Sequence, residues 1–447
     1  WAFYLFTQWA RSAIPRLRVD QFLDVVRVGH PARAHPDLRE HTLDQRLNER
    51  PAFQKSEELR QEALGLIEER RDLTTPSGQW RRGLSDEEIH HLAEENRTSR
   101  GLSEHRIQEM SDYLRISDRI DDLFEECDRL EDRAIRRLLD DVDVVCSTNT
   151  GAGSDLLAGV PFDWVCVDEA TQATEPSTLI PATKGDQLFM AGDHRQLQPT
   201  VLSEEASEQG LSRSLFERLA DEYESSIRSL LTVQYRMHND IMTFSNDQFY
   251  DGAMVSAPGV VDHTLDDLPS YHPESVRSVH RRWLNPRPPM QWIDTTALPG
   301  SDETHEGSHS SFNRSEIEVV DALVDVFGDS GLRGSNLAVI APYKAHVELL
   351  RDRIEDDEIE IDTVDGFQGR EKEVVIISFV RSNPSGAIGF LSDERRLNVS
   401  LTRARRKLIL VGDVSTLTRT RLFDQLHTYV DEVGTVETVD WSTVRGE

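Results

Sequence analysis

Two adjacent carboxylates are the residues of this sequence whose type and position most clearly suggest chemistry. The stretch FDWVCVDEATQ places Asp168 and Glu169 directly after a strand-like run, with Gln172 close behind. Ligands of open α/β sheets bind outside the carboxyl ends of the strands. An Asp at that edge can hold Mg²⁺, and a neighbouring Glu can deprotonate an attacking water. An acid pair is more often a solvated loop, but the preceding strand and Gln172 favour the catalytic interpretation.

A second strand-like run ends in a loop that suits a phosphate group. The stretch LFMAGDHRQLQP places Gly192 and Asp193 at the end of the run and Gln196 in the following loop. The neutral amide of Gln196 can donate a hydrogen bond to a phosphate oxygen. An ordinary strand-to-loop turn is the alternative. The order of the two stretches, GDxxQLxP after DEAxQ, disfavours that alternative.

Two arginine-bearing stretches follow in the second half of the chain. In QYRMH, Tyr235 offers a flat face for a base and Arg236 offers a guanidinium fork for phosphate. In NVSLTRARRK, Arg403 and Arg405 are predicted to lie on a short helix before a strand, where Arg403 can stabilise charge on a transferred phosphoryl group. A surface pair is the alternative for the first stretch, and a basic helix cap is the alternative for Arg405, Arg406 and Lys407.

The stretch TVDGFQGREKEVVIISF predicts a glycine-flanked turn before a buried strand. Gly369 closes this turn, and Gln368 and Glu371 lie where a ribose or a coupling contact could sit. A turn of this kind is uninformative when it occurs alone.

The elements that would position these residues are short apolar runs separated by helical segments. The runs are DVVCST, FDWVCVDEA, DQLFMAGD, MQWIDT, LAVIAPY, EVVIISF and KLILVGD. Runs of this length, bounded by polar turns, predict buried parallel strands. Stretches such as SRSLFERLADEY and HVELLRDRIEDD predict the connecting helices, so the fold class is α/β. We expect Pro258–Pro289 to form a surface loop, and we find no internal repeat.

The segment from residue 45 to 140 differs from the rest, because apolar residues recur in it at helical spacing amid dense charge. We expect two or three helices with solvated faces and a loop at Thr75–Gly83. Before it, Val25–Asp44 predicts a strand and a proline-marked loop. The predicted domains are therefore 1–44, which opens the first α/β domain, a helical insertion at 45–140, the rest of the first domain at 141–225, and a second domain at 226–447.

The charge balance is unusual for a chain that handles phosphates. The net charge is −31, with 81 acidic residues against 50 basic ones, and only five of the basic residues are lysines. This composition favours a high-salt cytoplasm, where screening to about 3 Å mutes self-repulsion. Cys127, Cys146 and Cys166 match no zinc or disulfide spacing, so we expect reduced, largely buried thiols. We expect no membrane association, because no apolar run reaches the ~18 residues of a membrane span.

The ordered set DEATQ, GDHRQLQP, QYRMH, TVDGFQGRE and NVSLTRAR resembles the superfamily 1B helicases of the up-frameshift, senataxin and immunoglobulin-mu-binding-protein type. The resemblance runs from about Val25 to Thr416. It implies two RecA-like parallel-sheet domains, the first one truncated. It also implies an ATP-driven motor that moves 5′ to 3′ along single-stranded DNA or RNA. With the composition, it suggests a halophilic archaeal source.

The resemblance implies a role for each matching residue. Asp168 would coordinate Mg²⁺ and Glu169 would activate water. Gln196 would sense the γ-phosphate, which Arg236 and Arg403 would contact. The ATP-binding residues would be Gln172, Gly192, Asp193, Tyr235 on the adenine, Gly369, and Glu371 on the ribose. The residues implied to contact the nucleic acid are Ser147, Thr148, Pro342, Tyr343 and Thr363.

One part of the family pattern is missing. No G-x-x-x-x-G-K-[ST] stretch, which cradles the β- and γ-phosphates, occurs in the sequence. The chain also begins at Trp1 rather than at Met, so we expect the natural N-terminus to lie upstream. We therefore expect a helicase fragment with negligible ATPase activity of its own. The alternative is a non-catalytic remnant that binds nucleic acid without using nucleotide.

Overall fold

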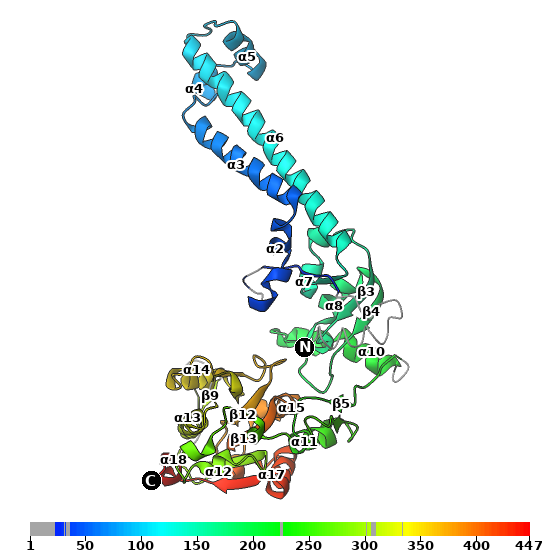
Figure 1. Ribbon diagram of the computed structural model, residues 1–447, viewed down its shortest axis with the longest axis vertical. Helices are drawn as coiled ribbons and strands as arrows, with labels where there is room; N and C mark the ends of the chain where they lie inside the picture. The colour runs from blue at the N-terminus through cyan, green and yellow to red at the C-terminus, as the bar shows by residue number, and fades with distance from the viewer. Residues whose placement is uncertain are drawn as a thin grey trace. The chain divides into compact units, whose positions relative to one another are not determined.

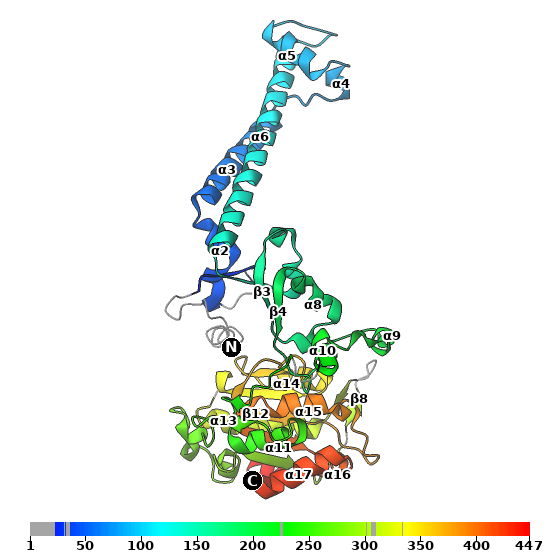
Figure 2. The ribbon, with the colours of Figure 1, turned by 90° about the vertical axis from the view of Figure 1, so that its right-hand side faces the viewer.

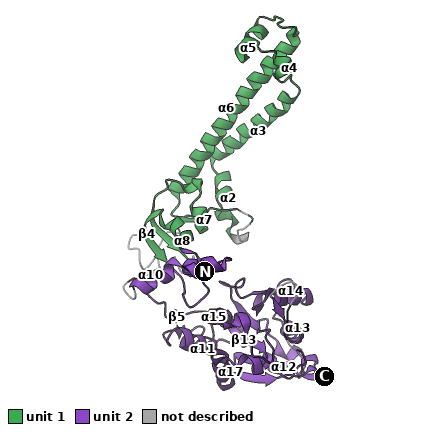
Figure 3. Cartoon of the chain, turned by 180° about the vertical axis from the view of Figure 1, so that it is seen from behind, with its two compact units in different colours: residues 1–168, 176–190 green, residues 169–175, 191–447 purple. Residues whose placement is uncertain are grey.

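The computed structural model describes residues 23–30, 32, 36–223, 227–300, 302–304, 310–332 and 334–447. More than half of the stretch 1–44, predicted to open the first domain, lies outside these residues. The chain divides into two compact units (Figure 3). Unit 1 consists of residues 1–168 and 176–190, and unit 2 of residues 169–175 and 191–447. None of the described helices combines the length and the apolar character needed to cross a membrane.

Unit 1 contains two short parallel sheets. Strand β1 (Val25–Arg27) pairs with β2 (Val144–Cys146), and β3 (Phe162–Val167) pairs with β4 (Gly185–Met190). The small helical elements beside them are η2 (Pro36–His41), α7 (Asn149–Ala152), η3 (Asp155–Leu157) and α8 (Glu175–Ala182), the first residue of which belongs to unit 2. The strands occur where the sequence predicts them. The predicted burial is wrong for β3 and β4, because Trp164 and Leu188 are 37% and 38% exposed and Cys166 is exposed as well.

Between β1 and β2 the chain forms a long helical hairpin. Its helices are α2 (Leu43–Asn48), α3 (Pro51–Arg71), α4 (Gly78–Arg81), α5 (Asp86–Glu94) and α6 (Glu104–Asp141). Pro51 starts α3, where its fixed φ suits the first turn. The 38 residues of α6 extend roughly 57 Å, and α3 lies alongside them (Figures 1 and 2). Helix α4 lies inside the predicted loop at Thr75–Gly83.

The far end of the hairpin contains a repeat that the sequence reading missed. The stretch RGLSDEEI at 82–89 recurs as RGLSEHRI at 100–107. In each copy an arginine with positive φ and a glycine precede a buried leucine, and a serine then caps the next helix. The copies face each other: Arg82 donates to the carbonyl of Arg100, and Arg100 donates to the carbonyl of Arg82. The expectation of no internal repeat is therefore wrong.

Unit 2 contains a six-stranded, all-parallel sheet, which confirms the predicted α/β class. Its order is β11-β10-β12-β13-β7-β14. The strands are β7 (Met290–Asp294), β10 (Leu337–Ala341), β11 (Glu360–Thr363), β12 (Lys372–Ser378), β13 (Ala404–Gly412) and β14 (Thr435–Thr438). Two small pairs accompany it: parallel β5 (Val233–Gln234) with β6 (Val255–Ser256), and antiparallel β8 (Glu303–Thr304) with β9 (Ser311–Phe312).

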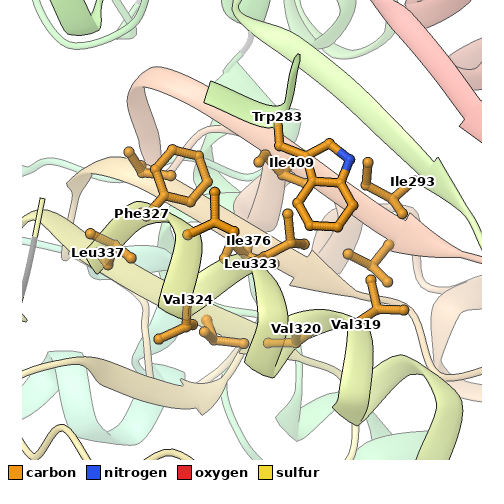
Figure 4. Packing of buried hydrophobic residues seen from close by; sticks show 14 of the residues in the cluster. Trp283, Ile293, Val319, Val320, Leu323, Val324, Phe327, Leu337, Ile376 and Ile409 are labelled. Carbon is orange, nitrogen blue, oxygen red and sulfur yellow. The ribbon is translucent and has the colours of Figure 1, made fainter. Parts of the chain in front are cut away.

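Helices cover both faces of this sheet, because alternate residues of each strand point to opposite sides. One face packs against α12 (Arg281–Leu284), α13 (Arg314–Asp329), α14 (Lys344–Arg353) and α18 (Trp441–Arg445) (Figure 4). The other packs against α11 (Asn239–Phe249), α15 (Glu394–Leu401), α16 (Val414–Leu417) and α17 (Arg421–Val433). The remaining helical elements include η4 (Ala170–Gln172), α9 (Glu204–Ala206), η5 (Ser207–Leu211), α10 (Leu215–Tyr223), η7 (Leu265–Asp267), η8 (Pro273–Ser275), η9 (Gly334–Asn336) and η10 (Gly389–Ser392).

The segment Pro258–Pro289 is not the surface loop that its composition suggested. Leu265, Trp283 and Leu284 are fully buried in the core on the α13 side of the sheet. Short helical turns interrupt the segment and direct these apolar side chains inward. Composition misled here because a few large apolar residues determine where the segment packs.

Candidate nucleotide and nucleic-acid site

The chain crosses from unit 1 to unit 2 between the two predicted catalytic carboxylates. Strand β3 ends at Val167, and Asp168 follows it at the exposed end of unit 1. Glu169 has the left-handed φ of 51°, which is uncommon for a residue with a side chain and frequent at functional sites. Its Oε2 accepts a hydrogen bond from Gln172 Nε2 at 2.7 Å. The structure therefore assigns Gln172 an orienting contact with Glu169.

The turn after Glu169 is held against the loop that carries Gly192. Ala170 N–H donates to the carbonyl of Ala191 at 2.8 Å. A Cβ on Gly192 would lie 3.1 Å from the amide nitrogen of Thr171. The close approach of the two loops therefore favours glycine at position 192, because a side chain there would force the loops slightly apart.

Asp193 is the centre of a hydrogen-bond network that joins two predicted motifs, GDHRQLQP and NVSLTRAR, through Tyr250. Its Oδ2 accepts from Gln196 Nε2 at 2.8 Å and from the Tyr250 hydroxyl at 2.6 Å. Asn398 Nδ2 donates to the Tyr250 oxygen at 2.8 Å and to the carbonyl of Arg195 at 3.0 Å. Burial and the nearby Asp193 carboxylate raise the pKa of Tyr250, so the phenol keeps its proton and remains a donor.

Sequence reasoning missed Tyr250 and Asn398. Asn398 lies inside the stretch NVSLTRAR, but an asparagine on a helix gives no signal of its own. Tyr250 directly follows α11, which begins directly after QYRMH. Its position one residue beyond that helix was the only available signal.

Arg403 is 2% exposed, and its hydrogen bonds go to neutral oxygens. It lies between α15 and β13 rather than on the predicted helix, which ends at Leu401. Its guanidinium donates to Val399 O at 2.9 Å, to Thr402 Oγ1 at 3.0 Å and to Arg370 O at 3.4 Å. Within the described residues, none of these hydrogen bonds goes to a carboxylate, so they leave the charge of the guanidinium unneutralised.

Several charged groups lie within electrostatic reach of Arg403. Burial lowers its pKa to about 9, nearby Arg236 adds to that shift, and Glu169, Tyr250 and Glu371 oppose it. The group is therefore still a cation at neutral pH. Residues from DEATQ, QYRMH, TVDGFQGRE and NVSLTRAR thus come together around one buried guanidinium.

Arg236 and Glu371 form an ion pair, although the sequence assigned them to different parts of the nucleotide. Arg236 Nε donates to Glu371 Oε2, and its Nη1 donates to Thr402 O at 3.1 Å. Glu371 Oε1 also faces Arg405 Nε at 3.8 Å. In this structure the Glu371 carboxylate orients arginines of the cluster.

Tyr235 and Gly369 lie in turns next to these buried groups, and Tyr235 is exposed. Gln234 Oε1 accepts from the amides of Arg236 and Met237, both at 2.8 Å, and so holds the turn. The Tyr235 side chain is left 61% exposed, with its ring available to a planar group. Gly369 has φ of +77°, as the tight turn before β12 requires.

The predicted nucleic-acid contacts fall in both units. Ser147 and Thr148 are exposed after β2 in unit 1, and Thr148 Oγ1 caps α7 by accepting from Gly151 N–H at 3.1 Å. Pro342 and Tyr343 follow β10 in unit 2, and Thr363 ends β11. Because Ala341 and Thr363 are partners in the parallel β10–β11 ladder, the second group shares one edge of the sheet. Tyr343 is only 4% exposed.

A buried polar network lies behind that edge. The fully buried Glu316 accepts from the Val380 amide at 2.8 Å and from the Ser378 hydroxyl at 2.5 Å. Asn313 Nδ2 donates to the Val380 carbonyl at 3.1 Å. Together they hold Val380 at φ of +72°, a costly conformation for a β-branched residue. Burial raises the pKa of Glu316 to about 8 and lowers that of neighbouring His346 to about 3.

Comparisons with known proteins relate the sequence of this chain to a family. Two family models, each described as an AAA domain, match residues 16–204 and 211–415. An uncharacterized ATP-dependent helicase of Methanocaldococcus jannaschii is 39% identical over 406 residues, which are 90% of this chain and 59% of that protein. The DNA-binding protein SMUBP-2 of Mus musculus is 42% identical, over 71% of this chain and 32% of its own length.

A third relative also matches the chain over about two thirds of its length. A homologue of regulator of nonsense transcripts 1 from Neurospora crassa is 35% identical over 67% of this chain and 27% of its own length. The chain therefore spans less than two thirds of each of these relatives. With both AAA domain models matched in order along its length, the chain belongs to the superfamily 1 helicases.

Proposed function

We propose that this chain is the motor core of an ATP-dependent helicase or translocase that moves 5′ to 3′ along single-stranded nucleic acid. The observation that carries the proposal is the buried Arg403 cation, whose hydrogen bonds go to neutral oxygens. A buried charge is costly unless it is paired. A phosphate group of a bound nucleotide is the partner that fits this position.

The described residues suit Mg²⁺-ATP as the nucleotide. Asp168 would hold the metal, and Glu169, oriented by Gln172, would accept a proton from the attacking water. Gln196 would detect the terminal phosphate, and Arg236 and Arg403 would stabilise its charge. Tyr235 would pack on the base, beside backbone at Gly192 and Gly369, with Glu371 near the ribose. ATP would supply the phosphoanhydride bond, and the chain's residues would supply position and charge.

The hydrogen bonds around Asp193 would couple the phosphate-sensing Gln196 to the helix that precedes Arg403. A change in the hydrogen bonding of Gln196 would shift the Asp193 carboxylate, which accepts from both Gln196 and Tyr250. Tyr250 also bonds Asn398 on α15, so the shift would reach that helix. Helix α15 leads directly to Arg403. Nucleotide state would then affect the strand-contacting residues Ser147, Thr148, Pro342, Tyr343 and Thr363 through movement of these elements.

We further propose that residues 1–447 alone turn over ATP negligibly, because no G-x-x-x-x-G-K-[ST] stretch in the sequence can cradle the phosphates. The composition leads us to place the protein in a high-salt cytoplasm, and folding should then strengthen in molar KCl. The missing stretch also favours a second candidate, a nucleic-acid-binding protein that uses no nucleotide.

The test compares the chain with a version that carries an upstream P-loop segment from a relative. We expect single-strand-stimulated ATP turnover only in the extended protein, with unwinding of 5′-tailed but not 3′-tailed duplexes. In that protein Glu169→Gln should lower turnover by about 10²–10⁴-fold, and Arg403→Ala by about 10³-fold or more. ATP binding should survive in Glu169→Gln.

Other results separate the two candidates. Robust turnover by residues 1–447 alone contradicts the proposed inactivity. An extended protein that binds strands and remains inert favours the non-catalytic candidate.

A further inference from the structure

One aromatic side chain lies exposed at the sheet edge that carries the predicted strand contacts. Phe390, in η10, is 54% exposed. Its neighbours Ile388 and Leu391 are 9% and 7% exposed and belong to the core on the α11 side of the sheet. The turn is therefore anchored on both sides of Phe390, and the phenyl ring is the part left in solvent.

Tyr343 packs against this turn and bonds to its backbone. The Phe390 amide donates to the Tyr343 hydroxyl at 3.3 Å, and that hydroxyl faces the Ile388 carbonyl at 3.4 Å. The two rings meet edge to face, with centroids 5.7 Å apart and planes at 70°. A Cβ at Gly389 would approach the Tyr343 hydroxyl to 2.6 Å, so glycine permits this contact. The buried Tyr343 thus acts as a support for Phe390 rather than as a free stacking surface.

A cation completes the surroundings of the ring. The Arg396 guanidinium lies over Phe390, 5.5 Å from its centroid. Asp393 and Asp365 hold this guanidinium at 3.0 Å and 3.4 Å. Asp365 lies two residues beyond Thr363, so the arrangement connects Phe390 to the carboxyl ends of both β10 and β11.

We propose that Phe390 stacks on an unpaired base of the bound single strand. This proposal rests on the proposed function, because it needs a strand along this edge. A single exposed apolar residue is common on protein surfaces and needs no ligand. Here the residue lies between two buried neighbours, its ring meets that of Tyr343 edge to face, and the Arg396 guanidinium lies over it. The ring also lies beside predicted backbone contacts, as in sites that bind single strands with little sequence preference.

The acidic composition makes such a contact useful. Phosphate contacts weaken steeply with salt, and a chain of charge −31 gains little from long-range attraction to a polyanion. Base stacking is much less sensitive to salt. Phe390 would therefore supply a larger share of strand affinity as the salt concentration rises.

The experiment measures fluorescence anisotropy of labelled 20-mers of deoxythymidine and of uridine on residues 1–447. Each strand has a matched version of the same length in which abasic sugars replace the bases. We expect Phe390→Ala to weaken binding of the base-bearing strands by about 5- to 150-fold, the range typical of one base–aromatic stack. Binding of the abasic strands should change by less than about twofold. The loss should stay constant across a salt series.

Matched variants test the chemistry of the contact. Phe390→Leu keeps an apolar side chain without a π face and should lose most of the affinity that Phe390→Ala loses. Leu202→Ala, at a side chain that is 98% exposed, should change nothing. In Phe390→Trp, base-bearing strands should quench the added indole fluorescence, and abasic strands should not.

Equal losses on base-bearing and abasic strands, or no loss at all, would overturn the stacking proposal while leaving strand binding intact. An unquenched indole in a protein that binds the strand would also overturn it. Failure of the unmodified chain to bind either strand would overturn both this proposal and the proposed strand-binding function.

Discussion

Strands β3 and β10 have similarly apolar sequences, but their side chains are buried to different extents. Both are short apolar runs that end at predicted functional residues. Every residue of β10 is buried, whereas in β3 only Val167 is. Strand β10 has a neighbour on each edge and a helical layer on each face, while within the described residues β3 pairs only with β4. An apolar run therefore specifies a strand, but the neighbours of that strand determine how much stability its side chains contribute.

The helical hairpin of unit 1 also differs from unit 2 in the kind of contacts that stabilise it. Its helices are determined by local signals such as Pro51 and the serine caps. Many of its charged contacts are exposed pairs, for example Arg119 with Glu62 at 2.8 Å. Pairs of this kind contribute little, about 0–1 kcal/mol. Unit 2 instead depends on contacts between residues far apart in the chain.

The largest expected difference is between two tryptophans. Trp292 in β7 is fully buried and donates to Gly412 O at 3.1 Å, whereas Trp164 in β3 is 37% exposed. Trp292→Ala should lower the free energy of unfolding by about 3–5 kcal/mol. Trp164→Ala should lower it by about 1 kcal/mol, because much of its surface stays in water. Urea unfolding monitored by circular dichroism measures both. Equal losses would show that β3 is packed as well as β7.

A smaller effect should appear as a pH dependence specific to unit 2. Burial raises the pKa of Glu316 from 4.5 to about 8, so between these values the folded chain keeps a proton that the unfolded chain has lost. The contribution of Glu316 to stability is therefore complete below about pH 4.5 and declines as pH rises toward 8. The slope should reach at most about 1.4 kcal/mol per pH unit.

Glu316→Gln provides the matched control, because a neutral amide can still accept from Val380 N–H and Ser378. The difference in unfolding free energy between the two proteins should shift in favour of the variant from pH 5 to pH 8. A difference that stays constant across this range would mean that Glu316 is ionised in the folded state.

The smallest effect should occur at the repeat in the hairpin. Ser85 and Glu88 form a reciprocal capping box at α5, whereas Ser103 caps α6 with a single bond from Arg106 N–H at 3.3 Å. Each serine-to-alanine change should cost about 1 kcal/mol locally, with Ser85→Ala the larger. Amide hydrogen exchange should speed up in the first turn of the affected helix and stay unchanged in α13. Faster exchange in α13 would indicate that the two units unfold together.

Much of the architecture was predictable because it depends on local signals. All seven apolar runs contain strands, and the segments SRSLFERLADEY and HVELLRDRIEDD contain α10 and most of α14. The errors concern packing. Composition failed for Pro258–Pro289, because Trp283 and Leu284 pack in the core. The expected burial failed for Cys166, because in the part of the chain that the structure describes β3 pairs only with β4 and most of its side chains are not buried.

The sequence by itself determined which residue types were available, their order along the chain, and the strands and turns that carry them, since these depend on neighbours within a few positions. Only the tertiary structure decided that Arg403 is buried, that Glu371 pairs with Arg236, and that Tyr250 joins Asp193 to Asn398. These contacts join residues 57 to 148 positions apart. Burial and pairing at such separations arise from packing of the whole unit, which no local pattern encodes.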